Sequence, residues 1–74
     1  MKQIIGYYKN VGVGREYGTL IAYMQENVTD IAKANYVVYT IGNIVYVSKL
    51  KDGEETLIAC ASNFSFQTDS AYNI

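Results

Sequence analysis

The sequence lacks the residues that small domains usually use for reinforcement. It contains no histidine, no proline and no tryptophan, and Cys60 is its one cysteine. A lone cysteine excludes an internal disulfide, and without histidine it cannot complete a structural zinc site. A chain of 74 residues buries only about 60% of its unfolded surface, so its core needs further support. Self-association is the reinforcement that remains, and we expect a homo-oligomer of one domain, residues 1–74, without metal or cofactor.

The missing histidine also argues against catalysis. Histidine is the commonest general base, and a thiol needs a base or a lowered pKa to act as a nucleophile. Cys60 stands in an apolar segment, so we expect a buried structural thiol. The acidic side chains form no convincing catalytic pair; those considered are Glu16, Glu26, Asp30, Asp52, Glu54 and Glu55. The sequence therefore predicts a protein that is not an enzyme.

Charge is scarce as well. The six basic residues are spread along the chain, and the formal net charge is −1. Proteins that follow a phosphate backbone usually concentrate positive charge, so nucleic acid is a disfavoured partner. No segment reaches the roughly 18 apolar residues of a membrane span, and residues 1–10 have no signal-peptide pattern. A free thiol suits a reducing compartment, and we expect a cytoplasmic protein with no membrane partner.

The clearest pattern that is present lies between residues 36 and 61. Residues 36–41 and 44–49 are rich in β-branched and aromatic side chains, and Gly42-Asn43 between them predicts a two-residue hairpin turn of type I′ or II′. The expected facing pairs are Ile41 with Ile44, Tyr39 with Tyr46, Val37 with Ser48, Thr40 with Val45, Val38 with Val47, and Tyr36 with Lys49. A second turn at Asp52-Gly53 leads into a strand at 56–61. Its loop has two or three residues, and the choice decides which face Leu57 and Ile58 occupy.

The first half of the chain gives less decided patterns. Residues 3–8 predict a strand that ends at the glycine-punctuated stretch 10–14. From 17 to 35, apolar residues at helical spacing favour one long amphipathic helix; they are Tyr17, Leu20, Ile21, Met24, Val28, Ile31 and Ala32. Alternatively, residues 18–24 form a strand, and Asn27 caps a short helix with Asp30 near its N-terminus. We expect the long helix, with residues 29–34 helical in either case.

Together these segments predict an α+β fold. It consists of a small antiparallel sheet of about four to five strands, with two C-terminal hairpins at Gly42-Asn43 and Asp52-Gly53. One helix lies between the first strand or strands and the hairpins. Residues 62–74 are an extra strand or a mobile tail. Phe64 and Phe66 are two apart, as on one face of a strand, which could join this sheet or a neighbour's.

Both faces of the central hairpin are apolar. One face carries Val37, Tyr39, Ile41, Ile44 and Tyr46, and the other carries Tyr36, Val38, Val45 and Val47. A sheet that is wetted on one side shows polar residues there, and one helix covers only one face. The second face is therefore covered by the C-terminal residues, or its tyrosines face water with their hydroxyl ends, or it is a contact surface for a second copy or a partner. We expect a contact surface.

Two groups of residues are candidates for binding. Gly12, Gly14 and Arg15 would form a loop before the expected helix. With Lys9 beside it, this loop could hold a phosphate or carboxylate at the helix N-terminus, although a plain flexible turn is the alternative. Tyrosine is enriched at protein–protein interfaces and at sites where nucleic-acid bases stack. Of the eight tyrosines, those we assign to binding are Tyr7, Tyr8, Tyr36, Tyr39 and Tyr46.

Three functions are compatible with these features. The first is a non-catalytic oligomeric protein that blocks or sequesters a protein partner through its tyrosine-bearing sheet face. The second is an oligomer that sequesters a small anionic ligand such as a nucleotide, with tyrosine on the base and the loop at 12–15 on the phosphate. The third, less favoured because basic residues are few, is a weak single-stranded nucleic-acid binder.

The general features of the chain also resemble a class of inhibitors. Small size, high tyrosine content, absence of histidine and a bare α+β layout are similar to the small inhibitor proteins of bacteriophages and mobile elements, such as anti-CRISPR and other anti-defence proteins. The resemblance rests on these features and not on a motif. It implies that the first function takes the form of inhibition.

Overall fold

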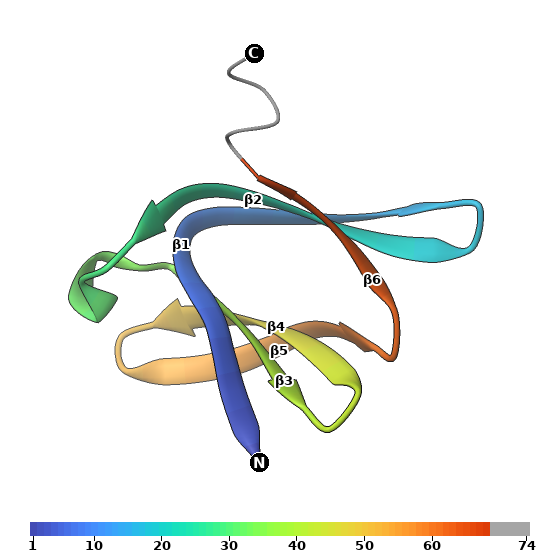
Figure 1. The fold of residues 1–74 in the computed structure, drawn as a ribbon. Coiled ribbons are helices and arrows are strands. Elements are labelled where there is room, and N and C mark those ends of the chain that lie inside the picture. The colour runs from blue at the N-terminus through green and yellow to red at the C-terminus, as the bar shows by residue number, and fades with distance from the viewer. Residues whose placement is uncertain (69–74) are drawn as a thin grey trace.

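The computed structural model describes residues 1–68, which form six strands in one mixed sheet of order β5-β4-β3-β1-β2-β6. The strands are β1 (Lys2–Glu16), β2 (Thr19–Val28), β3 (Tyr36–Ile41), β4 (Ile44–Lys51), β5 (Glu54–Ala61) and β6 (Phe64–Thr68). A single 3-10 turn, η1 (Ile31–Lys33), lies between β2 and β3 (Figure 1).

The expected α+β fold with four to five strands is wrong, because no helix of seven or more residues occurs within residues 1–68. The region expected as a long helix is β2, so the alternative strand interpretation is correct there. Helical structure in the described part of the chain is confined to η1, where the Asp30 carboxylate accepts a hydrogen bond from the Ala32 N–H at 3.0 Å. Asn27 is not the cap, since its side-chain amide donates to the Tyr7 carbonyl at 3.1 Å.

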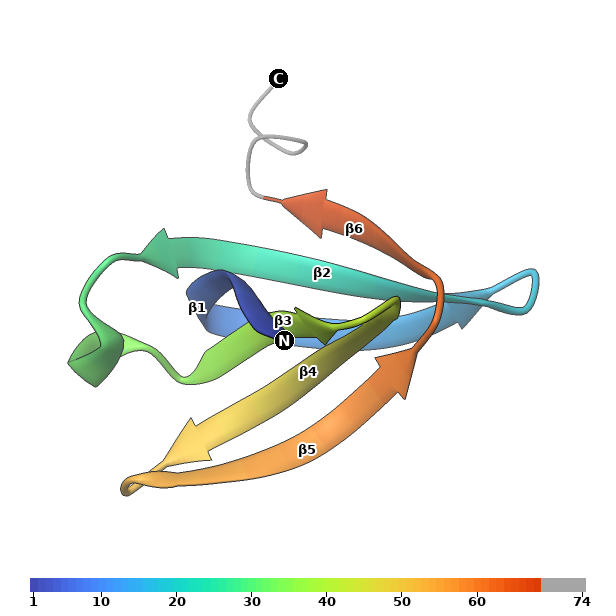
Figure 2. The same cartoon turned by 60° about the horizontal axis from the view of Figure 1, so that its bottom comes forward.

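The fold depends on the length of β1. Residues 2–8 of this strand pair with β3, whereas residues 7–16 pair with β2. A β-bulge between Ile4 and Gly6 adds to the bend of the strand, and the sheet folds over along β1. The second half of β1 forms an upper layer with β2 and β6, and β3, β4 and β5 form a lower layer (Figures 1 and 2). The strand expected at residues 3–8 therefore exists but continues through the glycine stretch.

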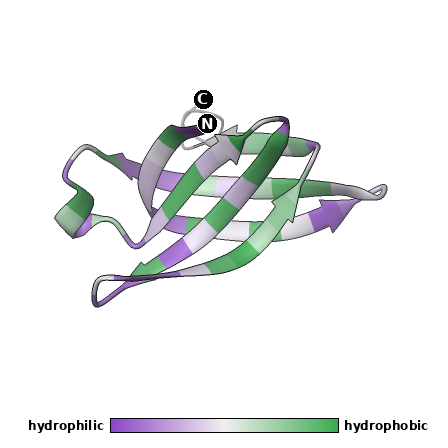
Figure 3. Cartoon of the chain, turned by 90° about the horizontal axis from the view of Figure 1, so that it is seen from below, coloured by the Kyte–Doolittle hydropathy of each residue, from purple (hydrophilic) through white to green (hydrophobic). Residues whose placement is uncertain are grey.

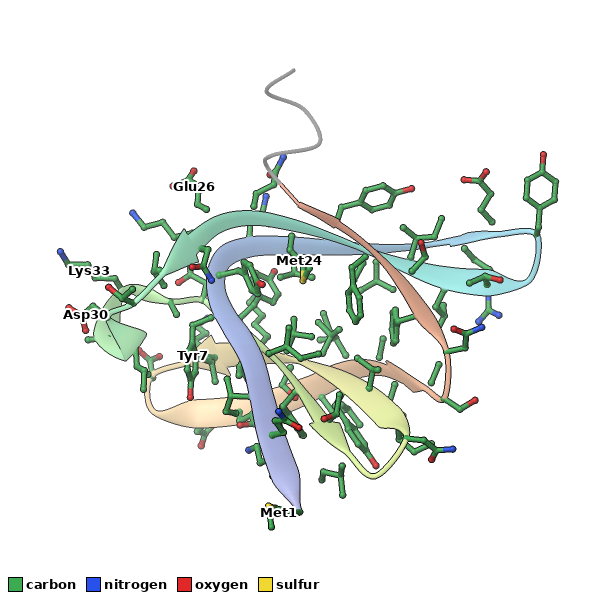
Figure 4. The ribbon with its side chains drawn as sticks, viewed as in Figure 1. Met1, Tyr7, Met24, Glu26, Asp30 and Lys33 are labelled. Carbon is green, nitrogen blue, oxygen red and sulfur yellow. The ribbon has the colours of Figure 1, made fainter. Side chains whose placement is uncertain are left out.

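The core lies between these two layers. Val38 of β3 and Val47 of β4 have no exposed surface, and they belong to one cluster with Met24 of β2. The Met24 side chain points into the space between the layers (Figure 4). The whole buried cluster is Tyr8, Val11, Ala22, Met24, Val38, Val47 and Phe64. Because side chains alternate along a strand, each of these strands turns its other side chains away from the core.

The segment after β5 contains a strand, β6, which is one of the two alternatives expected for residues 62–74. β6 joins the chain's own sheet and runs parallel to β2, with Phe64 opposite Leu20. Phe64 is buried and stacks on Phe66, with the ring centroids 6.1 Å apart. Residues 69–74, which belong to the region expected as an extra strand or a mobile tail, lie outside the described residues.

The two C-terminal hairpins are confirmed. All six expected pairs occur between β3 and β4, and a positive φ at Gly42 but not at Asn43 fits a type II′ turn. The second loop has two residues, because Asp52 and Gly53 both have positive φ and the strands resume pairing directly beyond them. A bulge in this ladder places Leu57 opposite Ser48 and leaves Ile58 as the extra residue. Leu57 therefore shares the face of Ser48, and both apolar side chains are exposed.

Ser48 gives a stability prediction, because it is fully buried and its hydroxyl has no hydrogen-bond partner among residues 1–68. An unpaired buried hydroxyl costs about 1–3 kcal/mol. We expect Ser48→Ala to raise the free energy of unfolding by about 1 kcal/mol, since it removes this penalty and leaves only a small void. Urea denaturation measures the change, with the exposed Ser65→Ala as an unchanged control. A less stable Ser48→Ala variant would contradict the prediction.

Candidate interaction surface

The lower layer turns one side to the core and its other side, the outer face, away from it. Three rows of laterally paired residues cross this outer face. The middle row is Ile4, Tyr39, Tyr46 and Cys60; the two flanking rows are Lys2, Ile41 and Ile44, and Tyr7, Val37, Ser48 and Leu57. Seen from below, hydrophobic segments of adjacent strands lie next to one another (Figure 3). Every residue of the three rows except Lys2 is uncharged.

The centre of the outer face is covered by the chain, but its rim is not. Val37 and Tyr39 are buried. The large apolar side chains of the rim remain exposed by two-fifths to one half: Ile4 by 40%, Ile41 by 42%, Ile58 by 45% and Leu57 by 51%. The chain therefore leaves aliphatic side chains on β1, β3 and β5 in contact with water.

The charge of Lys2 on the outer face is balanced by Glu55. The Lys2 Nζ atom lies 3.8 Å from a Glu55 carboxylate oxygen and 4.2 Å from the centroid of the Tyr39 ring. Tyr39 in turn stacks on Tyr46, with centroids 5.1 Å apart and planes at 11°. Lys2 and Glu55 lie on the two outermost strands that contribute to this face, and the twist of the sheet explains how two such corners can approach each other. The ion pair passes close to Tyr39 and helps to cover it.

The predicted tyrosines do not form one site. Tyr39 and Tyr46 form the stacked pair in the middle row, and Tyr7 lies in a flanking row. Tyr36 instead packs against the core cluster from its edge, and Tyr8 is a member of that cluster. The structure therefore brings Tyr7, Tyr39 and Tyr46 to one surface and separates Tyr8 and Tyr36 from them.

Tyr8 contributes to the packing of the core and not to a binding surface. Its ring lies so close to Gly6 that a Cβ atom there would stand 2.8 Å from the Tyr8 hydroxyl oxygen. Burial raises the pKa of the Tyr8 phenol above its ordinary value of 10.0, and a hydrogen bond with the Asn27 side chain partly offsets this. The phenol is therefore protonated throughout the neutral range, and the ring packs between the layers.

The loop expected at residues 12–15 is wrong, because Gly12, Gly14 and Arg15 all lie within β1. The chain turns only at Tyr17-Gly18, where both residues have positive φ, and the next element is β2 and not a helix. A Cβ atom at Gly14 would meet the Tyr23 ring at 3.5 Å. A tyrosine ring thus lies beside a glycine in mid-strand, and no loop or helix N-terminus exists there to hold an anion.

Two of the residues predicted to bind a ligand or partner, Lys9 and Tyr36, lie together at one end of the sheet. Lys9 and Tyr36 line a hollow of about 440 Å³ at one end of the sheet, together with Lys49 and Lys51. The prediction selected Lys9 and Tyr36 but missed both β4 lysines. They stand two apart in β4, and only the pairing of β1, β3 and β4 brings them to the same side as Lys9.

Cys60 is exposed, so the prediction of a buried thiol is wrong. It lies on β5, which is the last strand on its side of the sheet, and residues 56–61 of this strand carry no charge. Natural proteins usually protect such edges with charges, prolines or bulges. The bulge at Ile58 is the only one of these three devices present within residues 56–61.

Sequence reasoning also missed the aliphatic rim. Ile4 falls in a segment that was expected as a strand, but its position beside Tyr39 follows from the β1–β3 pairing. Leu57 and Ile58 could not be placed without the bulge. The available signal was the change of character along this strand, which starts with Glu54 and Glu55 and continues, after Thr56, with two apolar residues.

Within residues 1–68, no three histidine, cysteine, aspartate or glutamate side chains are grouped so that they could hold a metal ion. The same part of the chain contains no helix with the length and apolar character needed to span a bilayer. Compared with known protein families, with curated proteins and with solved structures, the chain shows no match.

Proposed function

We propose that the chain is a small non-catalytic binding protein that assembles with a second copy through its outer face. The observation that carries this proposal is the outer face, whose three residue rows contain one charged residue, the paired Lys2, and whose rim exposes aliphatic side chains. Burying apolar surface yields about 25 cal/mol per Å², and contiguous exposed apolar patches are typical of contact sites. No catalytic step is proposed, because the chain has no histidine.

A second copy is the occupant that fits this surface best. Two outer faces can pack as stacked sheets about 10 Å apart, with strands inclined by about 30°. Such packing meets no charge repulsion, because Lys2 is paired with Glu55 on the same face. The net charge of −1 also gives little repulsion between two chains. Assembly would add the reinforcement that a domain of this size cannot obtain from disulfides.

Blocking of a protein partner is the activity that we propose for the assembled protein. A small protein without catalytic groups can inhibit by covering a partner's surface, as the inhibitors of phages and mobile elements do. Of the features behind that resemblance, small size, high tyrosine content and absence of histidine remain, whereas the α+β layout does not. Tyr17 supports a contact role outside the outer face, because it is 98% exposed at the tip of the β1–β2 hairpin.

The molecular mass in solution tests the assembly. We expect analytical ultracentrifugation at about 100 μM protein to give twice the mass of the chain, because the apolar rim then becomes buried. Cys60 lies in the middle row, so its alkylation rate should fall as the protein concentration rises. A single chain at about 1 mM, with a Cys60 alkylation rate that does not depend on concentration, would refute the assembly.

A further inference from the structure

The structure contains a second surface of opposite character, the hollow at the end of the sheet. It is lined by Lys9, Asn10, Asn35, Tyr36, Lys49, Leu50 and Lys51. Three of the six basic residues of the chain therefore face one space of about 440 Å³. Pockets for small ligands range from about 300 to 1,000 Å³, so the space can accept a nucleotide-sized molecule.

The positive charge of this hollow is not neutralised from within. None of its lining residues is acidic, and the Lys2–Glu55 ion pair lies elsewhere. Lys49 has uncharged lateral neighbours, Tyr36 on β3 and Thr56 on β5, whereas Lys51 stands opposite Glu54 at the end of the ladder. Ammonium groups that face a space with no acidic lining residue favour an anion, and lysine binds phosphate groups as a point charge.

Asn35 holds the two sides of the hollow in a defined position. Its backbone N–H donates to the Tyr8 carbonyl at 3.0 Å, and its carbonyl accepts from the Leu50 N–H at 2.7 Å. Its side-chain amide donates to the Lys9 carbonyl at 3.0 Å. Asn35 therefore ties β1 at Lys9 to β4 at Leu50, the residue between Lys49 and Lys51. A site whose elements are positioned before binding loses less entropy when the ligand arrives.

Tyr36 supplies an aromatic wall beside the lysines. Its side chain packs against the core cluster on one side and remains partly exposed. The ring is thus supported from behind, and a base could stack on a supported ring of this kind. Asn10 is held by a hydrogen bond from its amide nitrogen to the Gln25 side-chain oxygen at 3.1 Å.

We propose that this hollow binds a small phosphorylated ligand, with Lys9, Lys49 and Lys51 on the phosphates and Tyr36 beside the remainder of the molecule. The site lies apart from the outer face and does not depend on assembly. The shared chemistry is a di- or triphosphate, which can come from an inorganic polyphosphate or from a nucleotide.

Isothermal titration with inorganic pyrophosphate and with ADP tests the site and separates the two sources. We expect both to bind at low salt, and we expect Lys9→Gln and Lys49→Gln each to weaken binding by about tenfold, since each removes one charge-assisted contact. The matched control is Lys33→Gln, because Lys33 lies on η1 and does not line the hollow, and its variant should bind within about twofold of the native chain. Equal affinities for the two ligands would identify the phosphates as the recognised group. Tighter binding of ADP that Tyr36→Leu abolishes would identify a nucleotide.

Three results would overturn the proposal. The first is no binding of either ligand at about 5 mM to a folded protein. The second is binding that Lys9→Gln and Lys49→Gln leave unchanged. The third is an oligonucleotide that binds far more tightly than ADP, with a steep salt dependence, which would show a single-stranded nucleic-acid site instead. Far-ultraviolet circular dichroism of each variant excludes unfolding as the cause of a loss.

Discussion

Replacing Gly6 with alanine should lower the free energy of unfolding by about 2 kcal/mol. A Cβ atom at this position would stand 2.8 Å from the Tyr8 hydroxyl oxygen and 3.0 Å from two carbons of its ring. Contacts this short force one of the two groups to move. The Tyr8 ring cannot move freely, because it is buried in the core cluster and is hydrogen-bonded to Asn27. Urea denaturation monitored by circular dichroism measures the loss.

Gly12 provides the matched control, because it lies in the same strand and a Cβ atom there meets nothing within 4 Å. Gly12→Ala should leave stability unchanged or raise it by a few tenths of a kcal/mol, since alanine restricts the unfolded chain more than glycine does. A double variant with Tyr8→Leu should recover part of the loss caused by Gly6→Ala, because the ring end is then absent. Equal stability of the two alanine variants would show that the ring does not lie over Gly6.

Replacing Leu57 with lysine should abolish assembly while the single chain remains folded. Leu57 is 51% exposed on the outer face, so a lysine there can reach water in the isolated chain. In the proposed dimer the same lysine would be desolvated against apolar surface, at a cost of several kcal/mol. A symmetric interface contains the position twice, and we expect the dissociation constant to rise by at least about 100-fold. Sedimentation equilibrium measures the constant.

Ile31 supplies the control for this substitution. It is 56% exposed, a fraction similar to that of Leu57, but it belongs to η1 and not to the outer face. Ile31→Lys adds the same charge and removes a similar apolar side chain, so it should leave the dissociation constant within about threefold of the native value. If both variants weaken assembly equally, the cause is the added charge and the outer face is not the interface. If neither does, another surface joins the copies.

The failure of the helix prediction has a specific physical cause. In residues 17–28 the apolar side chains satisfy a helical period, and alternation along Leu20, Ala22 and Met24 satisfies a strand equally well. The choice was made by a partner elsewhere in the chain, because Val11 of β1 faces Met24 and Val13 faces Ala22. The turn that permits this pairing is Tyr17-Gly18, and tyrosine at positive φ is not among the usual hairpin signals.

The glycine stretch was misread for a related reason. Glycine in a strand is weakly favoured, so Gly12 and Gly14 indicated a loop. In the fold they stand opposite Tyr23 and Ile21. A Cβ atom at Gly14 would meet the Tyr23 ring at 3.5 Å, whereas one at Gly12 would meet nothing within 4 Å. Pairing with β2 therefore keeps both glycines in a strand, and no local pattern shows this partner.

The sequence by itself determined the central hairpin, its register and its two apolar faces. These depend on contacts between residues close in the chain, where turn geometry and side-chain alternation leave one arrangement. Tertiary structure decided what each face meets. The bend of β1 closes one face into the core, sheet twist brings Lys2 to Glu55, and the bridge through Asn35 gathers Lys9, Lys49 and Lys51. These outcomes depend on long-range strand pairing, for which the free energy comes from burying the whole core and not from any single segment.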